Sequence, residues 1–222
     1  MKNIKIRPFK DKTIDAIIFD LGGVILNLSV RKSIDEFIKL GFSNAEEEME
    51  RLSRISDHEE PGIFRLYETG MISSTQFRAG IRKYIDKDLD DRDIDRAWSA
   101  MLLDLPPENL SLIGKLSKSF RIFLLSNTNA IHIENLNAIS ENNHGFSSLV
   151  KLFEKVYYSH IVKMRKPDVG IYHHVLKDAG LNPDSTLFID DSLINVQGAQ
   201  KAGLHAYHHP SNAGLDQIFE LS

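Results

Sequence analysis

The side chains of this 222-residue chain with the greatest potential for chemistry follow three short apolar segments. Asp20 comes directly after residues 16–19, Ser126 and Asn127 come after residues 122–125, and Asp190 and Asp191 come after residues 186–189. Carboxylate, hydroxyl and amide groups of this kind form a polar ligand-binding crevice if the fold brings them together. Because aspartate, serine and asparagine also cap helices well, helix capping is the alternative for each residue taken singly.

The three apolar segments are predicted to be buried strands of a parallel sheet. They are apolar on both faces instead of alternating with polar residues, which is typical of strands covered on both sides. Helical periodicity separates and follows them, with apolar faces around Ile113, Val175 and Ala199. Strands and helices that alternate with short connections indicate an α/β fold with a doubly wound parallel sheet.

The predicted sheet would bring the polar residues to one edge. In open α/β sheets, ligands bind outside the carboxyl ends of the strands. Gly22 and Gly23 follow Asp20 and form a loop whose backbone can approach a ligand closely. Lys166 precedes Pro167 at an expected helix start, from where a long cation can reach the crevice. We therefore expect Lys166 to act on the ligand and on Asp20 and not to stabilise the fold.

Residues 31–104 have a different character, with charged amphipathic helical patterns and no convincing strand. Ser73 and Gln76 match a capping box at the start of a helix that carries Phe77 and Ile81. This segment enters directly after the first strand, so we predict a helical cap that covers the sheet edge as a lid. Residues 1–30 and 105–222 are predicted to form the α/β core.

Composition excludes several classes of function. Lys and Arg number 27 against 31 Asp and Glu, and the net charge of −4 argues against nucleic acid as a partner. The absence of cysteine excludes disulfides and thiolate metal sites. No apolar run has the length of a membrane span, and the first residues lack the apolar core of a signal peptide. We expect a cytoplasmic enzyme or binding protein with no membrane partner.

Four motifs in order along the chain resemble those of the haloacid dehalogenase superfamily, in the members with a helical cap after the first motif. The motifs are Phe19-Asp20-Leu21-Gly22-Gly23-Val24, Leu125-Ser126-Asn127, Lys166-Pro167 and Phe188-Ile189-Asp190-Asp191-Ser192. They cover nearly the whole chain, although the cap matches in position and helicity only. The resemblance implies a Rossmann-like core and a phosphatase-like hydrolase of a small phosphorylated metabolite, with sugar phosphates as candidates.

The resemblance also implies roles for the crevice residues. Asp20 would attack phosphorus and form an aspartyl-phosphate, while Lys166 and Ser126 would hold phosphoryl oxygens and Asn127 would line the same pocket. Crowded carboxylates raise one another's pKa unless a cation intervenes, and a hard cation such as Mg²⁺ meets that need. The candidate metal ligands are Asp20, Asp190, Asp191 and the backbone carbonyl of Gly22.

One departure from the family pattern concerns the general acid. Phosphatases of the family usually carry a second aspartate two residues after the nucleophile, where this chain has Gly22. Loss of a general acid typically costs 10²–10⁴-fold in rate. Three explanations remain open: the substrate has a good leaving group, the protein is a slow or non-catalytic binder of phosphorylated ligands, or a cap residue substitutes. The cap candidates are His58, Glu59, Glu60 and Glu68.

Other interpretations have less support. Metal-free dehalogenation by Asp20 is disfavoured because members that catalyse it usually lack paired acids in the fourth motif. The acidic run at residues 86–91 lacks the glycine and glutamate of a calcium loop, and it predicts a solvated loop before the helix with Trp98. Three histidines near the C-terminus are predicted to lie on an exposed turn and not to bind a transition metal. They are His205, His208 and His209.

Overall fold

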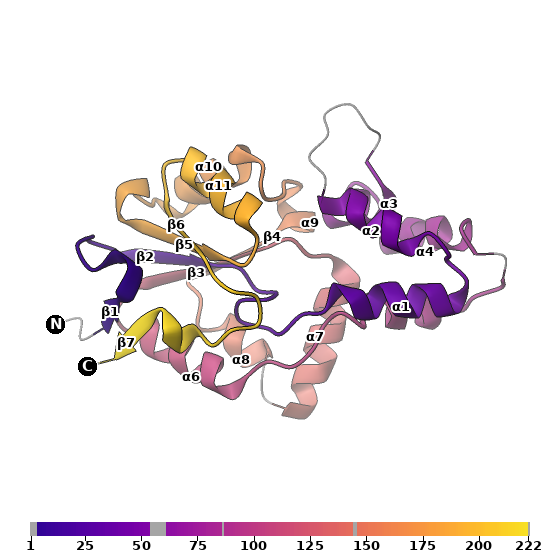
Figure 1. Cartoon of the computed structure of the whole chain (residues 1–222), viewed down its shortest axis with the longest axis horizontal. Coiled ribbons are helices and arrows are strands. Elements are labelled where there is room, and N and C mark those ends of the chain that lie inside the picture. The colour runs from indigo at the N-terminus through magenta and orange to yellow at the C-terminus, as the bar shows by residue number, and fades with distance from the viewer. Residues whose placement is uncertain (1–3, 54–60, 86, 144–145, 222) are drawn as a thin grey trace.

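The computed structural model describes residues 4–53, 61–85, 87–143 and 146–221, and a five-stranded parallel sheet forms the centre of the core (Figure 1). In spatial order its strands are β4 (Lys155–Tyr158), β3 (Arg121–Ser126), β2 (Ala16–Phe19), β5 (Thr186–Asp190) and β6 (His205–His208). The three strands predicted from the sequence are β2, β3 and β5. The doubly wound α/β fold is therefore confirmed.

Alternate residues of β2 belong to different apolar layers. Ile17 and Phe19 pack in one cluster with residues of α6 (Pro107–Leu116), α7 (Ala130–Asn143) and α8 (Phe146–Val150). Ile18 packs in another cluster with residues of α10 (Val169–Ala179) and α11 (Leu193–Lys201). Figure 1 shows these two groups of helices on opposite faces of the sheet. Because both faces are covered, the strand is apolar throughout.

The strand register brings the polar residues to one level. Phe19 pairs with Leu124 of β3 and with Ile189 of β5, so Asp20 follows at the carboxyl edge of both neighbours. The Asp20 N–H donates to the carbonyl oxygen of Ile189 at 2.9 Å, which continues the pairing one residue beyond the strand. Parallel pairing thus positions the residues that end each strand side by side.

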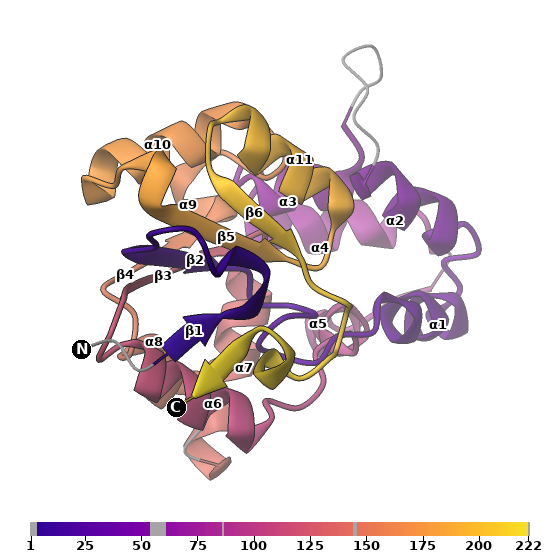
Figure 2. The same cartoon turned by 60° about the vertical axis from the view of Figure 1, so that its left-hand side comes forward.

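The chain termini pair with each other beside the core. β1 (Ile4–Ile6) and β7 (Phe219–Leu221) form a two-stranded antiparallel sheet, and Figure 2 shows both ends of the chain close together there. Short 3₁₀ helices cover Arg7–Phe9, Pro183–Ser185 and Leu215–Gln217. Across the described residues, no helix combines the length and the apolar character that a membrane span requires.

The prediction of an exposed turn for the C-terminal histidines is wrong. His205 and His208 begin and end β6, which lies at an edge of the sheet, and His209 is fully buried. The His209 N–H donates to the carbonyl oxygen of Asp190 at 2.9 Å. An edge strand has one unpaired side and tolerates polar residues, so its sequence does not look like that of a buried strand.

The described residues between β2 and α6 form five helices, which we call the cap: α1 (Val30–Leu40), α2 (Ala45–Ser53), α3 (Ile63–Glu68), α4 (Ser74–Arg82) and α5 (Asp91–Ser99). They enclose an apolar cluster separate from those of the core, in which the ring of Phe64 lies 4.9 Å from that of Trp98 and 5.7 Å from that of Phe77. The predicted capping box of Ser73 and Gln76 starts α4. The Asp90 side chain caps α5, as expected for a loop before the helix with Trp98.

The cap contacts the core at several places, and two of them position it over the sheet edge. The connecting segments lie side by side through an antiparallel bridge between Leu28 and Leu102. At the second place, the Ser159 hydroxyl at the start of α9 (Ser159–Val162) donates to the carbonyl oxygen of Glu68 at 2.6 Å. Gly70 approaches the core so closely that a Cβ there would lie 2.2 Å from the carbonyl oxygen of His160. These contacts position α3 over the sheet edge.

Candidate active site

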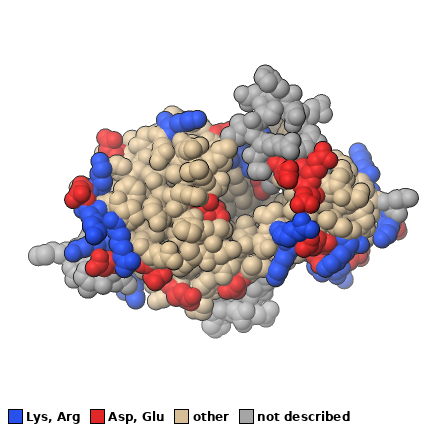
Figure 3. Space-filling view, in the orientation of Figure 1, with Lys and Arg blue, Asp and Glu red and all other residues tan. Residues whose placement is uncertain are grey.

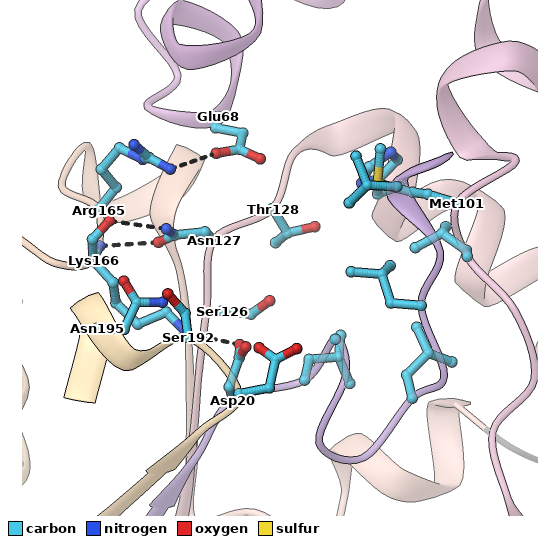
Figure 4. Close-up of a pocket in the computed structure, with 18 of the residues that line it drawn as sticks. Asp20, Glu68, Met101, Ser126, Asn127, Thr128, Arg165, Lys166, Ser192 and Asn195 are labelled. Atoms are coloured by element: carbon cyan, nitrogen blue, oxygen red, sulfur yellow. Dashed lines mark hydrogen bonds and ion pairs between the residues drawn. The ribbon is translucent and has the colours of Figure 1, made fainter. Parts of the chain in front are cut away.

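A cavity of about 310 Å³ lies between the carboxyl edge of the sheet and the cap. Asp20, Ser126, Lys166 and Asp191 line one end of it, which we call the floor (Figure 4). Figure 3 shows the corresponding hollow between core and cap, with acidic side chains visible inside. Asp190 is fully buried and contacts the floor through Lys166. The structure therefore brings together all the residues that the sequence places in the crevice.

Lys166 is the central cation of the floor. Its Nζ lies 2.7 Å from Asp20 Oδ1 and 2.6 Å from Asp190 Oδ2, and its side chain is only 1% exposed. Asp190 Oδ1 accepts hydrogen bonds from the Ser192 N–H at 2.8 Å and from Asn195 Nδ2 at 3.0 Å. Lys166 therefore neutralises two buried carboxylates. Because its removal would leave both without a cation, we expect Lys166 to stabilise the fold as well as to act on the ligand.

Asn127 of the second motif fixes the position of Lys166 through hydrogen bonds to its backbone. Asn127 Nδ2 donates to the carbonyl oxygen of Lys166, and Asn127 Oδ1 accepts from the Lys166 N–H, both at 3.0 Å. Ser126, the last residue of β3, is buried and lines the cavity. Asn127 thus lines the cavity as expected and also fixes the position of the lysine.

The electrostatics of the floor favour an additional cation. Burial raises the pKa of Asp20 to about 7; Lys166 opposes this shift, and Asp190 and Asp191 add to it. Burial also raises the pKa of Asp191. Burial by itself lowers the pKa of Lys166, but the carboxylates of Asp190 and Asp20 raise it above its ordinary value. Three carboxylates surround one ammonium group, which leaves negative charge uncompensated when all of them are ionised.

The donor set fits Mg²⁺. One carboxylate oxygen from each of Asp20, Asp190 and Asp191 lies within 4.8 Å of the other two, and hard divalent cations prefer such oxygens. Gly22 lines the same cavity. At Gly23, with φ +77°, a Cβ would lie 2.1 Å from Asp191 Oδ2. Only glycine at that position allows the loop after β2 to approach Asp191 this closely.

A buried ion pair occupies the cap side of the cavity. Glu68 Oε2 lies 3.3 Å from Arg165 Nη2, and both side chains are 10% exposed. Burial raises the pKa of Glu68, while Arg165 opposes that shift. Figure 4 shows this pair beyond Asn127 and away from Asp20. The other cap candidates for a general acid, residues 58–60, lie outside the described residues.

Several lining residues were missed from the sequence. Asn195, in the first turn of α11, lines the cavity and binds Asp190, and its position five residues after Asp190 is the only signal in the sequence. Thr128 and His132 also line the cavity. Glu68 and Arg165 are 97 residues apart, and nothing in a single sequence indicates that they pair.

Known proteins are similar to this chain over most of its length. A family model described as haloacid dehalogenase-like hydrolase matches residues 14–203. The D-ribitol-5-phosphate phosphatase of Bacteroides thetaiotaomicron is 30% identical over 206 residues, which are 93% of this chain and 96% of the relative.

Two solved structures are similar over core and cap. A haloacid dehalogenase family enzyme of Bacteroides thetaiotaomicron, in complex with magnesium and inorganic phosphate, has a TM-score of 0.80 and 37% identity over 92% of this chain and 98% of that one. A predicted haloacid dehalogenase-like family hydrolase from Porphyromonas gingivalis has a TM-score of 0.79 and 33% identity over 91% of this chain and 94% of that one. The family match spans all four motifs, from Asp20 to Asp191. The chain belongs to the haloacid dehalogenase-like hydrolase family.

Proposed function

We propose that the protein is a Mg²⁺-dependent phosphomonoesterase that hydrolyses a small phosphorylated metabolite through an aspartyl-phosphate on Asp20. The observation that carries this proposal is the contact of the Asp20 carboxylate with Lys166 at the floor of a cavity that Asp191 also lines. Two relatives support the same reaction class: one is named a phosphatase, and the other was solved with magnesium and inorganic phosphate.

The floor residues have different roles in phosphoryl transfer. An oxygen of Asp20 forms a bond to phosphorus as the bond to the leaving oxygen breaks, and water then cleaves the acyl phosphate to release inorganic phosphate and regenerate the carboxylate. Lys166 and the Ser126 hydroxyl hold phosphoryl oxygens as charge develops on them. Asn127 fixes the backbone of Lys166, and Asp190 orients its ammonium group.

Mg²⁺ would be held by Asp20, Asp191 and the Gly22 carbonyl, with Asp190 in the same cluster although both of its oxygens already accept hydrogen bonds. When bound, the ion supplies charge neutralisation between the carboxylates and the incoming phosphate dianion. Among the described residues, Lys166 is the one cation in direct contact with Asp20. The three-carboxylate cluster is also the reason to prefer this reaction to metal-free dehalogenation.

The absence of an acid at Gly22 favours one alternative, a slow or non-catalytic binder of phosphorylated ligands. Gly22 has no side chain to protonate the leaving oxygen, and Glu68 is engaged with Arg165. Sugar and sugar-alcohol phosphates are candidate substrates because one relative is named D-ribitol-5-phosphate phosphatase. The net charge of −4 gives no reason to expect nucleic acid as a partner.

Phosphate release from p-nitrophenyl phosphate tests the proposal, because this ester needs little general acid catalysis. The wild-type protein with Mg²⁺ should be active, and both chelation of the metal and Asp20→Asn should abolish activity. Asp11→Asn, a change of the same kind at an exposed position, is the matched control and should retain activity. Activity of the Asp20→Asn variant, or activity in chelator, would exclude the mechanism.

A further inference from the structure

One part of the cavity wall is apolar, although Glu68 of α3 lines the same cavity. The apolar side chains come from the first linker, the start of α1, α5 and the residues after it, and α7 of the core. They are Leu28, Val30, Trp98, Met101, Leu102 and Leu136. Figure 4 shows Met101 across the cavity from Lys166 and Asn127. Trp98 and Met101 belong to the apolar cluster of the cap, and Leu28 and Leu102 pack against it.

Three of the polar side chains that line the cavity beyond the floor are paired with protein groups. Glu68 and Arg165 neutralise one another, so this pair does not require a charged group on the ligand. His132 Nε2 binds the carbonyl oxygen of Trp98 at 3.1 Å, and its ring stacks on the Trp98 indole with 4.6 Å between centroids. Burial lowers the pKa of His132 to about 4, so the ring is neutral at neutral pH.

A polyhydroxylated leaving group that lies against the apolar wall would place hydroxyls against hydrocarbon. A buried hydroxyl that loses its hydrogen bonds lowers affinity roughly 5- to 150-fold. A hydrocarbon leaving group loses no hydrogen bonds there, and each methylene that leaves water raises affinity roughly three- to fourfold. The cavity volume of about 310 Å³ is near the lower end for small-molecule pockets, so the group must be compact.

We propose that the preferred substrate is a phosphate monoester of a short alkyl or aryl alcohol, with its phosphate at Asp20 and Lys166 and its hydrocarbon against the wall around Met101. This inference rests on the proposed function and specifies its leaving group. It ranks such esters above the sugar-alcohol phosphate that the name of the relative suggests.

Binding of alkylphosphonates tests whether the apolar wall binds hydrocarbon, and it does not require hydrolysis. Calorimetric dissociation constants in Mg²⁺ are measured for methyl-, propyl- and pentylphosphonate. We expect affinity to rise roughly three- to fourfold per methylene. A series that stays flat from methyl to pentyl would overturn the proposal. In Met101→Gln the gain per methylene should fall, whereas Met101→Leu, which keeps the wall apolar at similar volume, should retain it within about twofold.

Hydrolysis of two five-carbon esters then tests substrate preference. We expect kcat/KM for pentyl phosphate to exceed that for ribitol 5-phosphate by at least about tenfold, the cost of roughly one unpaired hydroxyl. Faster hydrolysis of ribitol 5-phosphate would overturn the proposal even if both esters are substrates. If no ester, p-nitrophenyl phosphate included, releases phosphate while the phosphonate series retains its slope, the proposed hydrolase function fails and the apolar site stands.

Discussion

Substitution Gly22→Asp places a carboxyl group two residues after the nucleophile, at the position where family phosphatases usually carry the general acid and this chain has none. Gly22 is not among the glycines with positive φ, so its backbone accepts an aspartate. A Cβ at this position would lie 3.2 Å from Leu28 Cδ2, a contact that a flexible leucine can relieve by a few tenths of an ångström. The variant is therefore expected to fold with the new carboxyl group at the cavity.

The expected gain depends on the leaving group. A positioned general acid contributes about 10²–10⁴-fold when the leaving oxygen needs a proton. Displacement of Leu28 and the addition of a fourth carboxylate to the floor reduce that benefit, so we expect roughly 10- to 100-fold for an alkyl phosphate. For p-nitrophenyl phosphate, whose leaving group departs readily as an anion, the expected change is within about threefold.

The assay compares kcat/KM of wild type and variant for the two esters at saturating Mg²⁺. Gly22→Asn has nearly the same size without a transferable proton and should give no gain. Gly23→Asp, one residue further along, should lose Mg²⁺ binding because its Cβ would lie 2.1 Å from Asp191 Oδ2. The reasoning is refuted if Gly22→Asp folds and binds Mg²⁺ but gains no more in kcat/KM for the alkyl ester than for p-nitrophenyl phosphate. The site would then not lack a general acid.

Lys166→Met should lower the unfolding free energy of the metal-free protein by about 3–5 kcal/mol, because it leaves two buried carboxylates without their cation. Mg²⁺ should restore part of this loss in chemical denaturation, and an unchanged stability would contradict the pairing of Lys166 with Asp20 and Asp190. His132 has its pKa lowered by burial from 6.5 to about 4, so the unfolded chain binds more protons between these values and stability should rise with pH across them. The rise should be about 3 kcal/mol and absent from His132→Gln, and equal pH profiles would show that His132 is not buried in its neutral form. Gly70 and Gly180 have φ of +63° and +60°, but only at Gly70 does a Cβ meet backbone, the carbonyl oxygen of His160. Gly180→Ala should cost about 1–2 kcal/mol and Gly70→Ala about 1–3 kcal/mol more, as measured by thermal unfolding, and equal costs would refute the close contact between cap and core.

The core and the floor residues could be predicted because their signals are local in the sequence. In β2 and β5, every residue is buried, so a run of apolar residues marks each strand and the aspartate after that run marks its carboxyl end. Parallel pairing in register then places Asp20 beside the end of β5. A site formed by the residues that end adjacent buried strands can therefore be predicted from the strand pattern.

The edge strands could not be predicted in the same way. β4 and β6 lie at the two ends of the sheet, and their residues are mostly half-exposed. Their sequences therefore mix polar with apolar residues and lack the continuous apolar run of a buried strand. His209 illustrates the consequence, because its full burial follows from the loop that leaves β6 and not from its residue type.

The cap side of the cavity could not be predicted for another reason. The bridge between Leu28 and Leu102 and the stacking of Trp98 on His132 join residues that are distant in sequence. Each of these side chains matches the pattern of an ordinary helix or linker. Their common role as one wall exists only after the cap has docked on the core, so substrate preference is a property of the assembled fold.

Two adjacent residues link the charge of the floor to the position of the cap. The Lys166 side chain points to Asp20 and Asp190, while that of Arg165 points in another direction, to Glu68 at the end of α3 (Figure 4). The backbone between them is fixed by the paired hydrogen bonds of Asn127. A shift of this segment that separates Lys166 from Asp20 would also move Arg165 relative to the cap.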